Sequence, residues 1–348
     1  MGLSTPVTAR TLALQGNVKQ QVNYLKLFRA DTAVKDWEAI RKCLTADYPE
    51  EKKKWSLIGQ SYGGFVATTY LSHAPEGLRE VFTTGGLPPV TQNNPDEVYR
   101  RLWKKVLERN MAFYEKYPED VDAIRRIDAR TGTHESTDED CRLIHRIFAM
   151  GINFGFHGGI DAVHDMLLNV STDVDLFGFV TKPTLHRIEA TGPFDNHVLY
   201  AVLHESIYCQ EGGCSAWSAR RMKPRESFSV ELPSGDEGIV FKGEMVDSTD
   251  FDVYPELKAL KEVAESIAKV DDWPDLYDID QLKRNEVPVY SATYVDDMYV
   301  DFEFAQETAK IIKGTKTYVT NTMYHNALRS RTDELLKNLF ALRDESID

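Results

Sequence analysis

A short segment near the start of the chain has the residue types and spacing of a serine nucleophile. Residues 59–64 have the sequence Gly-Gln-Ser-Tyr-Gly-Gly, which contains the pattern G-x-S-x-G. This pattern places a serine on a sharp turn between a strand and a helix, where its hydroxyl stands above the sheet at the positive end of the helix. Roughly one chain in ten of this length contains the pattern by chance. Ser61 is therefore a candidate nucleophile whose assignment depends on the elements around it.

The elements on both sides of Ser61 fit this requirement. The apolar run Trp55–Gly59 is typical of a buried strand, and Phe65–His73 is rich in small and apolar residues, as a packed helix is. Glu80–Thr84 is a second β-rich run. The order strand, turn, helix, strand predicts an α/β fold with a parallel sheet. The alternation returns near the end of the chain, where we expect a strand at Val287–Tyr294, a helix at Phe302–Ile312, a strand at Thr315–Thr320 and a helix at Ala327–Leu342.

A serine nucleophile also needs a base and an orienting acid, and in this kind of fold the acid precedes the histidine in the chain. His325 is the one histidine after residue 204, and it lies between the last predicted strand and the last predicted helix. It is therefore the candidate base. The acid is expected where the preceding strand ends, in the sequence Val-Asp-Asp-Met at 295–298. Spacing alone leaves Asp296 and Asp297 open.

The region between these two stretches has a different character. Residues 95–170 are predicted to be almost wholly helical, and residues 205–255 are irregular and rich in Gly, Ser, Pro and Glu. We therefore expect residues 1–88 and 286–348 to form an α/β core that is interrupted by a large insertion. Residues 89–285 are expected to form this insertion as a mainly helical cap domain.

A further helix is expected before the first strand, at Asp31–Leu44. Asp31 is a residue type that favours the N-cap position, because its carboxylate accepts a bond from a free N–H of the first turn. Apolar residues repeat along this segment at helical spacing, which predicts one buried face. The residues of that face are Val34, Trp37, Ile40 and Leu44.

Composition and charge limit the partners that this chain would bind. Lys plus Arg number 41 and Asp plus Glu number 55, which gives a net charge of −14 in 348 residues. An acidic surface repels phosphate backbones, so we expect no nucleic-acid partner. No apolar run approaches the roughly 18 residues that span a bilayer, so we expect no membrane partner. Four cysteines suit a reducing compartment, which predicts a cytoplasmic protein.

Metal and cofactor patterns are weak in this sequence. His157, Asp161, His164 and Asp165 repeat at helical spacing, but they lack the further convergent ligands that a zinc site needs. We therefore expect no metal. Patterns for phosphate-binding glycine loops and for calcium loops do not occur either, so we expect no cofactor.

Four segments together resemble one family of serine peptidases. They are GQSYGG at 59–64, LPPV at 87–90, VDDMYV at 295–300 and MYHNA at 323–327. Over essentially the whole chain the sequence resembles the prolyl aminopeptidase (proline iminopeptidase) family of α/β-hydrolases, particularly its fungal type. The resemblance implies an α/β-hydrolase core with a helical cap, which releases an N-terminal proline from peptides through an acyl-enzyme and without a cofactor. It assigns Ser61 as nucleophile and His325 as base, and because the family's acid precedes a methionine, it selects Asp297 over Asp296.

The resemblance also implies how the substrate is held. Family members bind the amino end of the substrate with carboxylates of the cap, one of them in a segment that resembles Leu203–Tyr208. Glu205 is therefore the expected amine-binding residue, in agreement with the need of a buried ammonium for an anionic partner. Glu189, in the sequence HRIEATG, is a second candidate. The expected partner is a peptide or small amide with a free N-terminus.

One part of the family pattern does not occur in this sequence. Family members carry N-terminal strands with an H-G-G-P-G loop that supplies an oxyanion-hole N–H, whereas the one HGG here, at 157–159, is interpreted as a turn between helices. The backbone N–H of Tyr62 is then the remaining expected oxyanion donor, and loss of the other costs about 2.7–4 kcal/mol of the barrier. We therefore expect an impaired hydrolase. Its core sheet would have an open edge at Trp55–Gly59, which favours a homo-oligomer.

Two other functions stay open at this point. An α/β-hydrolase that acts as an esterase or amidase on a non-peptide metabolite would use the same Ser61, His325 and aspartate. A catalytically inactive fragment would instead act as a binding or oligomerisation module through its open sheet edge. Recognition of the substrate's amino group by Glu205 separates the peptidase from the first of these alternatives.

Overall fold

The chain forms two compact units. The computed structural model describes residues 6–131, 138–191, 194, 197–224, 229–231 and 237–345. The first unit comprises Met1–Val22, Tyr99–Glu205 and Ala216–Lys269, and the second comprises Asn23–Val98, Ser206–Ser215 and Val270–Asp348.

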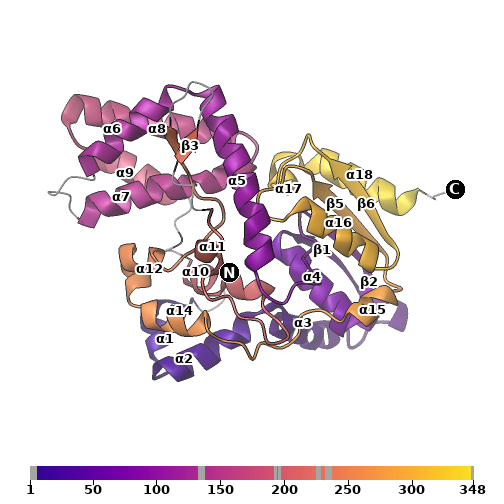
Figure 1. Cartoon of the computed structure of the whole chain (residues 1–348). Helices are drawn as coiled ribbons and strands as arrows, with labels where there is room; N and C mark the ends of the chain where they lie inside the picture. Colours follow the sequence, from indigo (N-terminus) through magenta and orange to yellow (C-terminus); the bar gives the residue numbers. More distant parts are fainter. Residues whose placement is uncertain are drawn as a thin grey trace. The chain divides into compact units, whose positions relative to one another are not determined.

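The second unit is built on a parallel sheet, which lies among helices in Figure 1. Within the described residues the sheet has four strands in the order β1-β2-β5-β6, and every pairing in it is parallel. This confirms the predicted α/β fold and its four strands, because all four lie within or close to the predicted ranges. The strands are β1 (Trp55–Gln60), β2 (Leu78–Thr84), β5 (Val289–Tyr294) and β6 (Thr315–Thr320).

Helices connect and cover these strands. The parallel connections require them, since the chain must return to the same end of the sheet after each strand. The helices and turns of this unit are η1 (Lys26–Phe28), α3 (Ala30–Leu44), η2 (Glu50–Lys52), α4 (Tyr62–His73), η3 (Pro75–Gly77), α15 (Ile279–Lys283), α16 (Phe302–Ile311), α17 (Ala327–Ser330) and α18 (Thr332–Asp344).

The central strands β2 and β5 are buried on both faces of the sheet, and successive residues of a strand point to opposite faces. Val81 of β2 belongs to a hydrophobic cluster that includes Val66 of α4 and Ala305 of α16. The next residue, Phe82, belongs to a second cluster that includes Leu335 of α18. The sheet is thus fixed between two layers of helices, and the ends of its strands are held in place for a site.

The helix predicted at Asp31–Leu44 differs from α3 at its start and along its apolar face. α3 begins at Ala30, with Arg29 in the N-cap position and no capping bond from a side chain, so the predicted cap at Asp31 is wrong. Val34 is buried as predicted. The other three apolar positions of that face are exposed: Trp37, Ile40 and Leu44.

The first unit is mainly helical, as predicted for residues 95–170. Its core contains aromatic rings, among them Phe113 and Phe154, whose ring centres are 4.9 Å apart. The predicted turn at 157–159 is confirmed, since Gly158 has a φ of 69° and precedes the helix that begins at Gly159. Its elements, of which α2, α5 and η6 extend into the second unit, are α1 (Ala9–Ala13), α2 (Val18–Leu25), α5 (Asp96–Lys116), α6 (Asp120–Thr131), α7 (Asp138–Ala149), η4 (Met150–Gly155), α8 (Gly159–Phe177), α9 (Lys182–Ala190), α10 (Val198–Leu203), η6 (Glu205–Tyr208), α11 (Ser218–Arg221), β3 (Ser229–Glu231), β4 (Glu237–Ile239), α12 (Asp250–Val253), α13 (Pro255–Lys258) and α14 (Lys261–Ile267).

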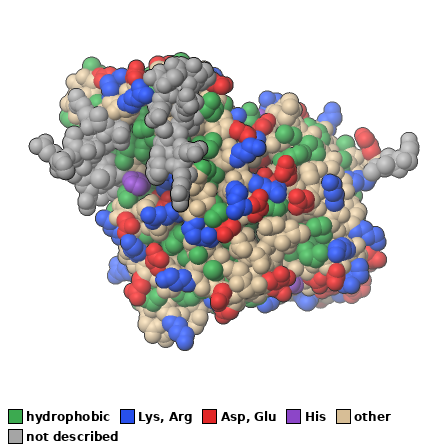
Figure 2. All heavy atoms as spheres, in the orientation of Figure 1, with side chains coloured by type: hydrophobic (Ala, Val, Ile, Leu, Met, Phe, Trp, Pro, Cys, Tyr) green, Lys and Arg blue, Asp and Glu red, His purple; other side chains and the backbone are tan. Residues whose placement is uncertain are grey.

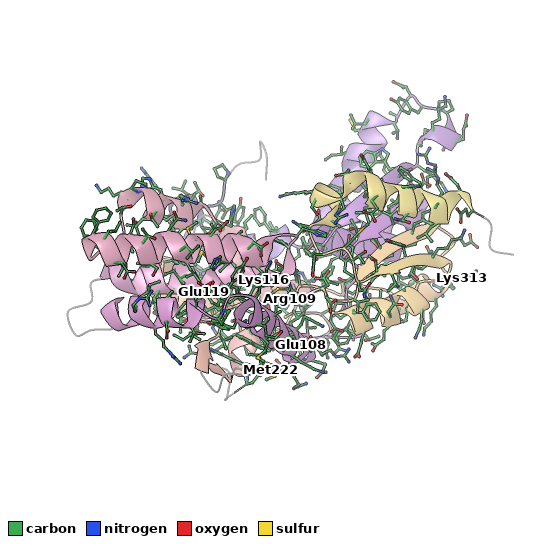
Figure 3. The ribbon with its side chains drawn as sticks, turned by 90° about the horizontal axis from the view of Figure 1, so that it is seen from above. Glu108, Arg109, Lys116, Glu119, Met222 and Lys313 are labelled. Carbon is green, nitrogen blue, oxygen red and sulfur yellow. The ribbon has the colours of Figure 1, made fainter. Side chains whose placement is uncertain are left out.

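Polar side chains of α5 tie this unit together. Arg109 donates from Nε to the carbonyl oxygen of Phe154 over 3.0 Å. Lys116, at the end of α5, pairs with Asp161 of α8. Figure 3 labels Arg109 and Lys116 on this helix. The long helix α5 is therefore anchored at two points to the segments that follow it.

The boundaries of the two units differ from those predicted. The predicted core was 1–88 and 286–348, and the predicted cap was 89–285. Residues 89–98, 206–215 and 270–285 belong to the second unit, and residues 1–22 belong to the first. Long-range bonds explain the first of these differences. The amide of Gln210 donates to the carbonyl oxygens of Val90 and Gln92, and its oxygen accepts from the backbone N–H of Leu276.

The charged side chains are mixed over the surface that Figure 2 displays, where Lys and Arg lie among Asp and Glu. An interspersed pattern lowers the potential that a net charge of −14 would otherwise focus on one patch. None of the helices formed by the described residues is long and apolar enough to cross a membrane.

Candidate active site

Ser61 lies on a strained turn between β1 and α4. Its φ of 55° and ψ of −126° are outside the regions that residues with a Cβ atom normally adopt. The turn is held by backbone bonds on both sides, since the Ser61 N–H donates to Thr84 over 3.1 Å and its carbonyl oxygen accepts from Gly64 over 2.8 Å. This is the strand–turn–helix context that a serine nucleophile requires.

Close backbone contacts around the turn explain two of its glycines. A Cβ atom at Gly59 would lie 2.4 Å from the carbonyl oxygen of Gly63, and one at Gly64 would lie 2.2 Å from the carbonyl oxygen of Gly86. At Gly63, by contrast, a Cβ atom would meet nothing within 4 Å. The turn therefore needs glycine at the first and last positions of GQSYGG, while the second glycine of the G-x-S-x-G pattern, Gly63, has space around it.

Asp297 and His325 form a buried pair at the carboxyl ends of β5 and β6. Asp297 Oδ2 is 2.8 Å from His325 Nδ1, and the two residues are only 3% and 6% exposed. The other carboxylate oxygen accepts from the backbone N–H groups of Tyr299 and Val300, over 2.8 and 3.0 Å. With Nδ1–H donating to the carboxylate, Nε2 is the basic nitrogen of the imidazole. Of the two aspartates that spacing alone could not separate, Asp297 is thus the one that bonds to the histidine.

The glycines at 85 and 86 join this pair to the turn that carries Ser61. A Cβ atom at Gly85 would lie 3.0 Å from Asp297 Oδ2 and 3.1 Å from His325 Nδ1. One at Gly86 would lie 2.7 Å from the carbonyl oxygen of Ser61. Two consecutive residues after β2 therefore contact the Asp–His pair and the serine turn, and both must be small.

A side-chain bond adds a second link between the two halves of the site. The amide of Gln60, next to Ser61, donates to the carbonyl oxygen of His325 over 2.9 Å. Tyr294, at the end of β5, bonds through its hydroxyl to Thr84. Burial raises the pKa of Tyr294 to about 12, so this hydroxyl is neutral and serves as a fixed bonding partner. The segments that hold Ser61 and His325 are thus bonded to each other directly.

Tyr62 is the first residue of α4 and directly follows the serine. The first N–H groups of a helix have no partner within the helix, so the amide of Tyr62 can donate to a negatively charged oxygen near Ser61. The ring of Tyr62 is partly exposed and lies 6.1 Å from that of Phe65. The ring of Phe65 is in turn 5.8 Å from that of Tyr208. Aromatic side chains therefore extend away from the turn.

Glu205 begins the short turn η6 and is buried. Its carboxylate accepts from two backbone N–H groups at the start of α11, those of Ser218 (3.1 Å) and Ala219 (2.8 Å). The preceding residues, Ala216 and Trp217, have φ values of 45° and 57°, which turn the chain sharply before these N–H groups. The glutamate is therefore a fixed carboxylate in the interior of its unit.

Glu189, the second candidate for amine binding, has a different environment. It lies on α9, its side chain is about half exposed, and Arg146 Nη2 is 4.0 Å from its carboxylate. An exposed carboxylate beside an arginine has little need of a further cation. Of the two candidates, Glu205 is therefore the buried carboxylate and Glu189 the half-exposed one.

The residues singled out as a weak metal pattern do not converge. His164 Nδ1 lies 2.8 Å from Asp120 Oδ2, and its ring stacks on that of Tyr117 at 3.7 Å. Asp161 pairs with Lys116 instead. Among the described residues, no group of three or more His, Cys, Asp or Glu side chains is placed to hold a metal ion.

Sequence reasoning missed several residues that shape the site. Gly85 and Gly86 directly follow the predicted strand Glu80–Thr84, and Gln60 lies within the G-x-S-x-G pattern, but none of the three is predicted to contact the site. A pair of glycines directly after a strand is the signal that would have pointed to the first two, because it marks a close approach of two backbones. Gln60 carries no such signal, since its bond to the His325 backbone joins residues 265 positions apart.

Two proteins named proline iminopeptidase align with nearly the whole chain. Proline iminopeptidase aneH of Aspergillus aculeatus is 43% identical over 350 residues, which cover 100% of this chain and 77% of that protein. Proline iminopeptidase of Aeromonas sobria is 37% identical over 348 residues, which cover 98% of this chain and 77% of that protein. No family model matches the chain.

Solved structures similar to this chain are distant. A hydrolase from Pseudomonas aeruginosa is 10% identical and covers 91% of this chain and 73% of its own length, with a TM-score of 0.37. An α/β fold family hydrolase from Bacillus anthracis is 12% identical and covers 94% of this chain and 76% of its own length, with a TM-score of 0.36.

The parallel sheet, the strained serine after β1 and the Asp–His pair after β5 and β6 define an α/β hydrolase. The identity to the two iminopeptidases extends along the whole chain. The chain therefore belongs to the proline iminopeptidase family, and the resemblance drawn from its four short segments is confirmed.

Proposed function

We propose that this chain is a serine peptidase that releases an N-terminal proline from peptides. The observation that supports this most strongly is the hydrogen-bonded pair of Asp297 and His325, which is packed through Gly85 and Gly86 against the strained turn at Ser61. The names of the two relatives support the substrate class, because both are proline iminopeptidases.

The proposed reaction proceeds in two steps through an acyl-enzyme. Ser61 Oγ attacks the carbonyl carbon of the first residue while His325 Nε2 takes the hydroxyl proton. The tetrahedral oxyanion accepts the N–H of Tyr62. When the C–N bond breaks, His325 gives its proton to the leaving amine, and a water molecule activated by the same nitrogen then releases proline from Ser61. Asp297 orients the imidazole and stabilises its charged form throughout.

The free amino end of the substrate would be bound by Glu205. A prolyl ammonium carries a positive charge into a site from which water is excluded, and it needs an anionic partner there. The carboxylate of Glu205 is already fixed by two backbone N–H groups, so little conformational entropy is lost when it accepts a further bond. Glu189 is the weaker candidate for this role.

Hydrolysis of a prolyl arylamide tests the proposal. We expect the wild type to release the arylamine, and Ser61→Ala to lower kcat by about 10⁶-fold. Ser56→Ala is the matched control, because Ser56 lies on the same strand and its hydroxyl bonds to the side chains of Glu80 and Arg79. Equal activity of the Ser61 and Ser56 variants would refute the assignment of the nucleophile.

Substrates with and without an amino group distinguish the peptidase from the esterase or amidase alternative. Glu205→Gln is expected to raise KM for the prolyl arylamide while it leaves hydrolysis of a simple aryl acetate unchanged. Turnover of aryl acetates alone by the wild type would favour the alternative. The cysteine content favours a cytoplasmic location for the peptidase, and among the described residues Cys43, Cys209 and Cys214 form no disulfide.

A binding or oligomerisation role rests on the edge strand β1. β1 pairs with β2 alone within the described sheet, and Ile58 on this strand is 52% exposed. Size-exclusion chromatography of the purified chain tests association through this edge. A dimer that Ile58→Lys dissociates would support a homo-oligomer, and a monomer at all concentrations would refute it.

A further inference from the structure

Arg29 is a buried arginine whose charge is bound mainly by backbone carbonyl oxygens. It is 2% exposed, directly before α3. Its Nη1 donates to the carbonyl of Cys209 over 2.6 Å and to that of Ser206 over 3.4 Å, and its Nη2 donates to the carbonyl of Pro274 over 2.6 Å. Its Nε donates to Asp31 Oδ1 over 3.3 Å.

These bonds join segments that are far apart in the chain. Ser206 and Cys209 are 177 and 180 residues from Arg29, and Pro274 is 245 residues away. The guanidinium also lies 4.6 Å from the centre of the Trp273 ring. A planar group with five N–H donors suits this task, because it can bond several carbonyls at once in fixed directions.

The segment that Arg29 holds is next to residues of the proposed site. Tyr208 lies in the chain between Ser206 and Cys209, whose carbonyls Arg29 bonds. Its ring packs on that of Phe65, four residues after Ser61. Glu205 directly precedes Ser206 in the chain and belongs to the same short turn, η6. The contacts of Arg29 thus fix the chain on both sides of Tyr208 and one residue after Glu205.

We propose that Arg29 is a positioning residue for substrate recognition: its bonds to Ser206, Cys209 and Pro274 hold the segment 206–209 so that Tyr208 packs beside the nucleophile turn. This inference rests on the proposed function. Because its bonds go to the segment 206–209 and to Pro274, Arg29 acts on the binding of the prolyl group rather than on proton transfer.

The test compares Arg29→Gln with Arg41→Gln. Arg41 is a matched control because it is also buried and lies on α3, yet it bonds to Glu38 and to the carbonyl of Lys53. We expect Arg29→Gln to raise KM for a prolyl arylamide by about tenfold with little change in kcat, since uniform binding is lost. Its hydrolysis of p-nitrophenyl acetate, which has neither ring nor amino group, should stay within about twofold of the wild type. Arg41→Gln should leave both KM values unchanged.

A second variant and a second measurement keep the test decisive. Arg29→Lys retains the charge but not the planar fork, so it is expected to show a smaller rise in KM, and it replaces Arg29→Gln if the latter does not fold. Hydrogen exchange at the amides of 206–210 should be faster in the Arg29 variants than in Arg41→Gln. Unchanged KM in the Arg29 variants, or an equal rise in Arg41→Gln, would overturn the inference alone. A wild type without activity on prolyl substrates would instead overturn the proposed function, and this inference with it.

Discussion

Two Asp–His pairs in this molecule have nearly the same geometry and different surroundings. In the second unit Asp297 Oδ2 is 2.8 Å from His325 Nδ1, and in the first unit Asp120 Oδ2 is 2.8 Å from His164 Nδ1. Both aspartate side chains are 1% exposed. A buried aspartate that bonds to a histidine is therefore not by itself a catalytic feature.

The difference lies in what completes each pair. The second oxygen of Asp297 accepts two backbone N–H groups, whereas Oδ1 of Asp120 has no partner within the described residues. Burial accordingly raises the pKa of Asp120. Only the pair of Asp297 is packed through glycines against a serine on a strained turn. The groups that surround an Asp–His pair, more than the pair itself, therefore determine whether it can form a catalytic site.

The largest expected effect comes from replacing the aspartate of each pair in turn. Asp297→Asn should lower kcat for a prolyl arylamide by about 10⁴-fold, because the amide no longer orients the imidazole or stabilises its charged form. Asp120→Asn should leave kcat within about twofold, since no nucleophile depends on His164. Steady-state kinetics of the two variants measures both. A similar loss in each would mean that the two pairs are not functionally distinct.

The next effect concerns the glycines that bring the site together. Gly64→Ala should destabilise the fold by about 1–3 kcal/mol and reduce activity, because its Cβ would overlap the carbonyl oxygen of Gly86. Gly63→Ala should be tolerated, or should stabilise α4 by up to about 1 kcal/mol through helix propensity. Urea unfolding of both variants gives the two free energies. The reverse order of stability would contradict the packing described for the turn.

The smallest expected effect concerns a third buried pair, Glu38 and Arg41, in which both carboxylate oxygens accept hydrogen bonds. Arg41 donates to both oxygens of Glu38, and this holds the pKa of Glu38 at about 2, below the usual 4.5. The folded state then binds its proton less tightly than the unfolded state, so the stability that this pair adds is present above pH 4.5 and is lost as the pH falls toward 2. Glu38→Gln should weaken the acid dependence of the unfolding midpoint in that range. An unchanged acid profile would show that the pair does not contribute.

Local sequence signals were sufficient for the turn at Ser61 and for its sheet. An apolar strand, a glycine-rich turn and a helix follow one another within 19 residues, so short-range patterning determines them. The position of His325 followed from the order of elements. Asp297 could not be separated from Asp296 by spacing, because the choice depends on which carboxylate meets the N–H groups of Tyr299 and Val300.

Long-range contacts account for what could not be predicted. Periodicity identified the apolar face of α3, but it does not say whether another element covers that face, and Trp37, Ile40 and Leu44 are exposed. The unit boundaries depend on bonds such as those of Gln210 to Val90 and Gln92. Arg29 precedes an ordinary helix in the sequence, and its role is visible only from carbonyls that lie 177 or more residues away.

The central claim is that His325, and not His164, activates Ser61. The rate at which a fluorophosphonate labels Ser61 measures this directly, with the site of labelling identified by peptide mapping. We expect the wild type and His164→Ala to be labelled at equal rates, and His325→Ala to be labelled far more slowly. Equal labelling of His325→Ala and the wild type, or loss of labelling in His164→Ala, would contradict the account.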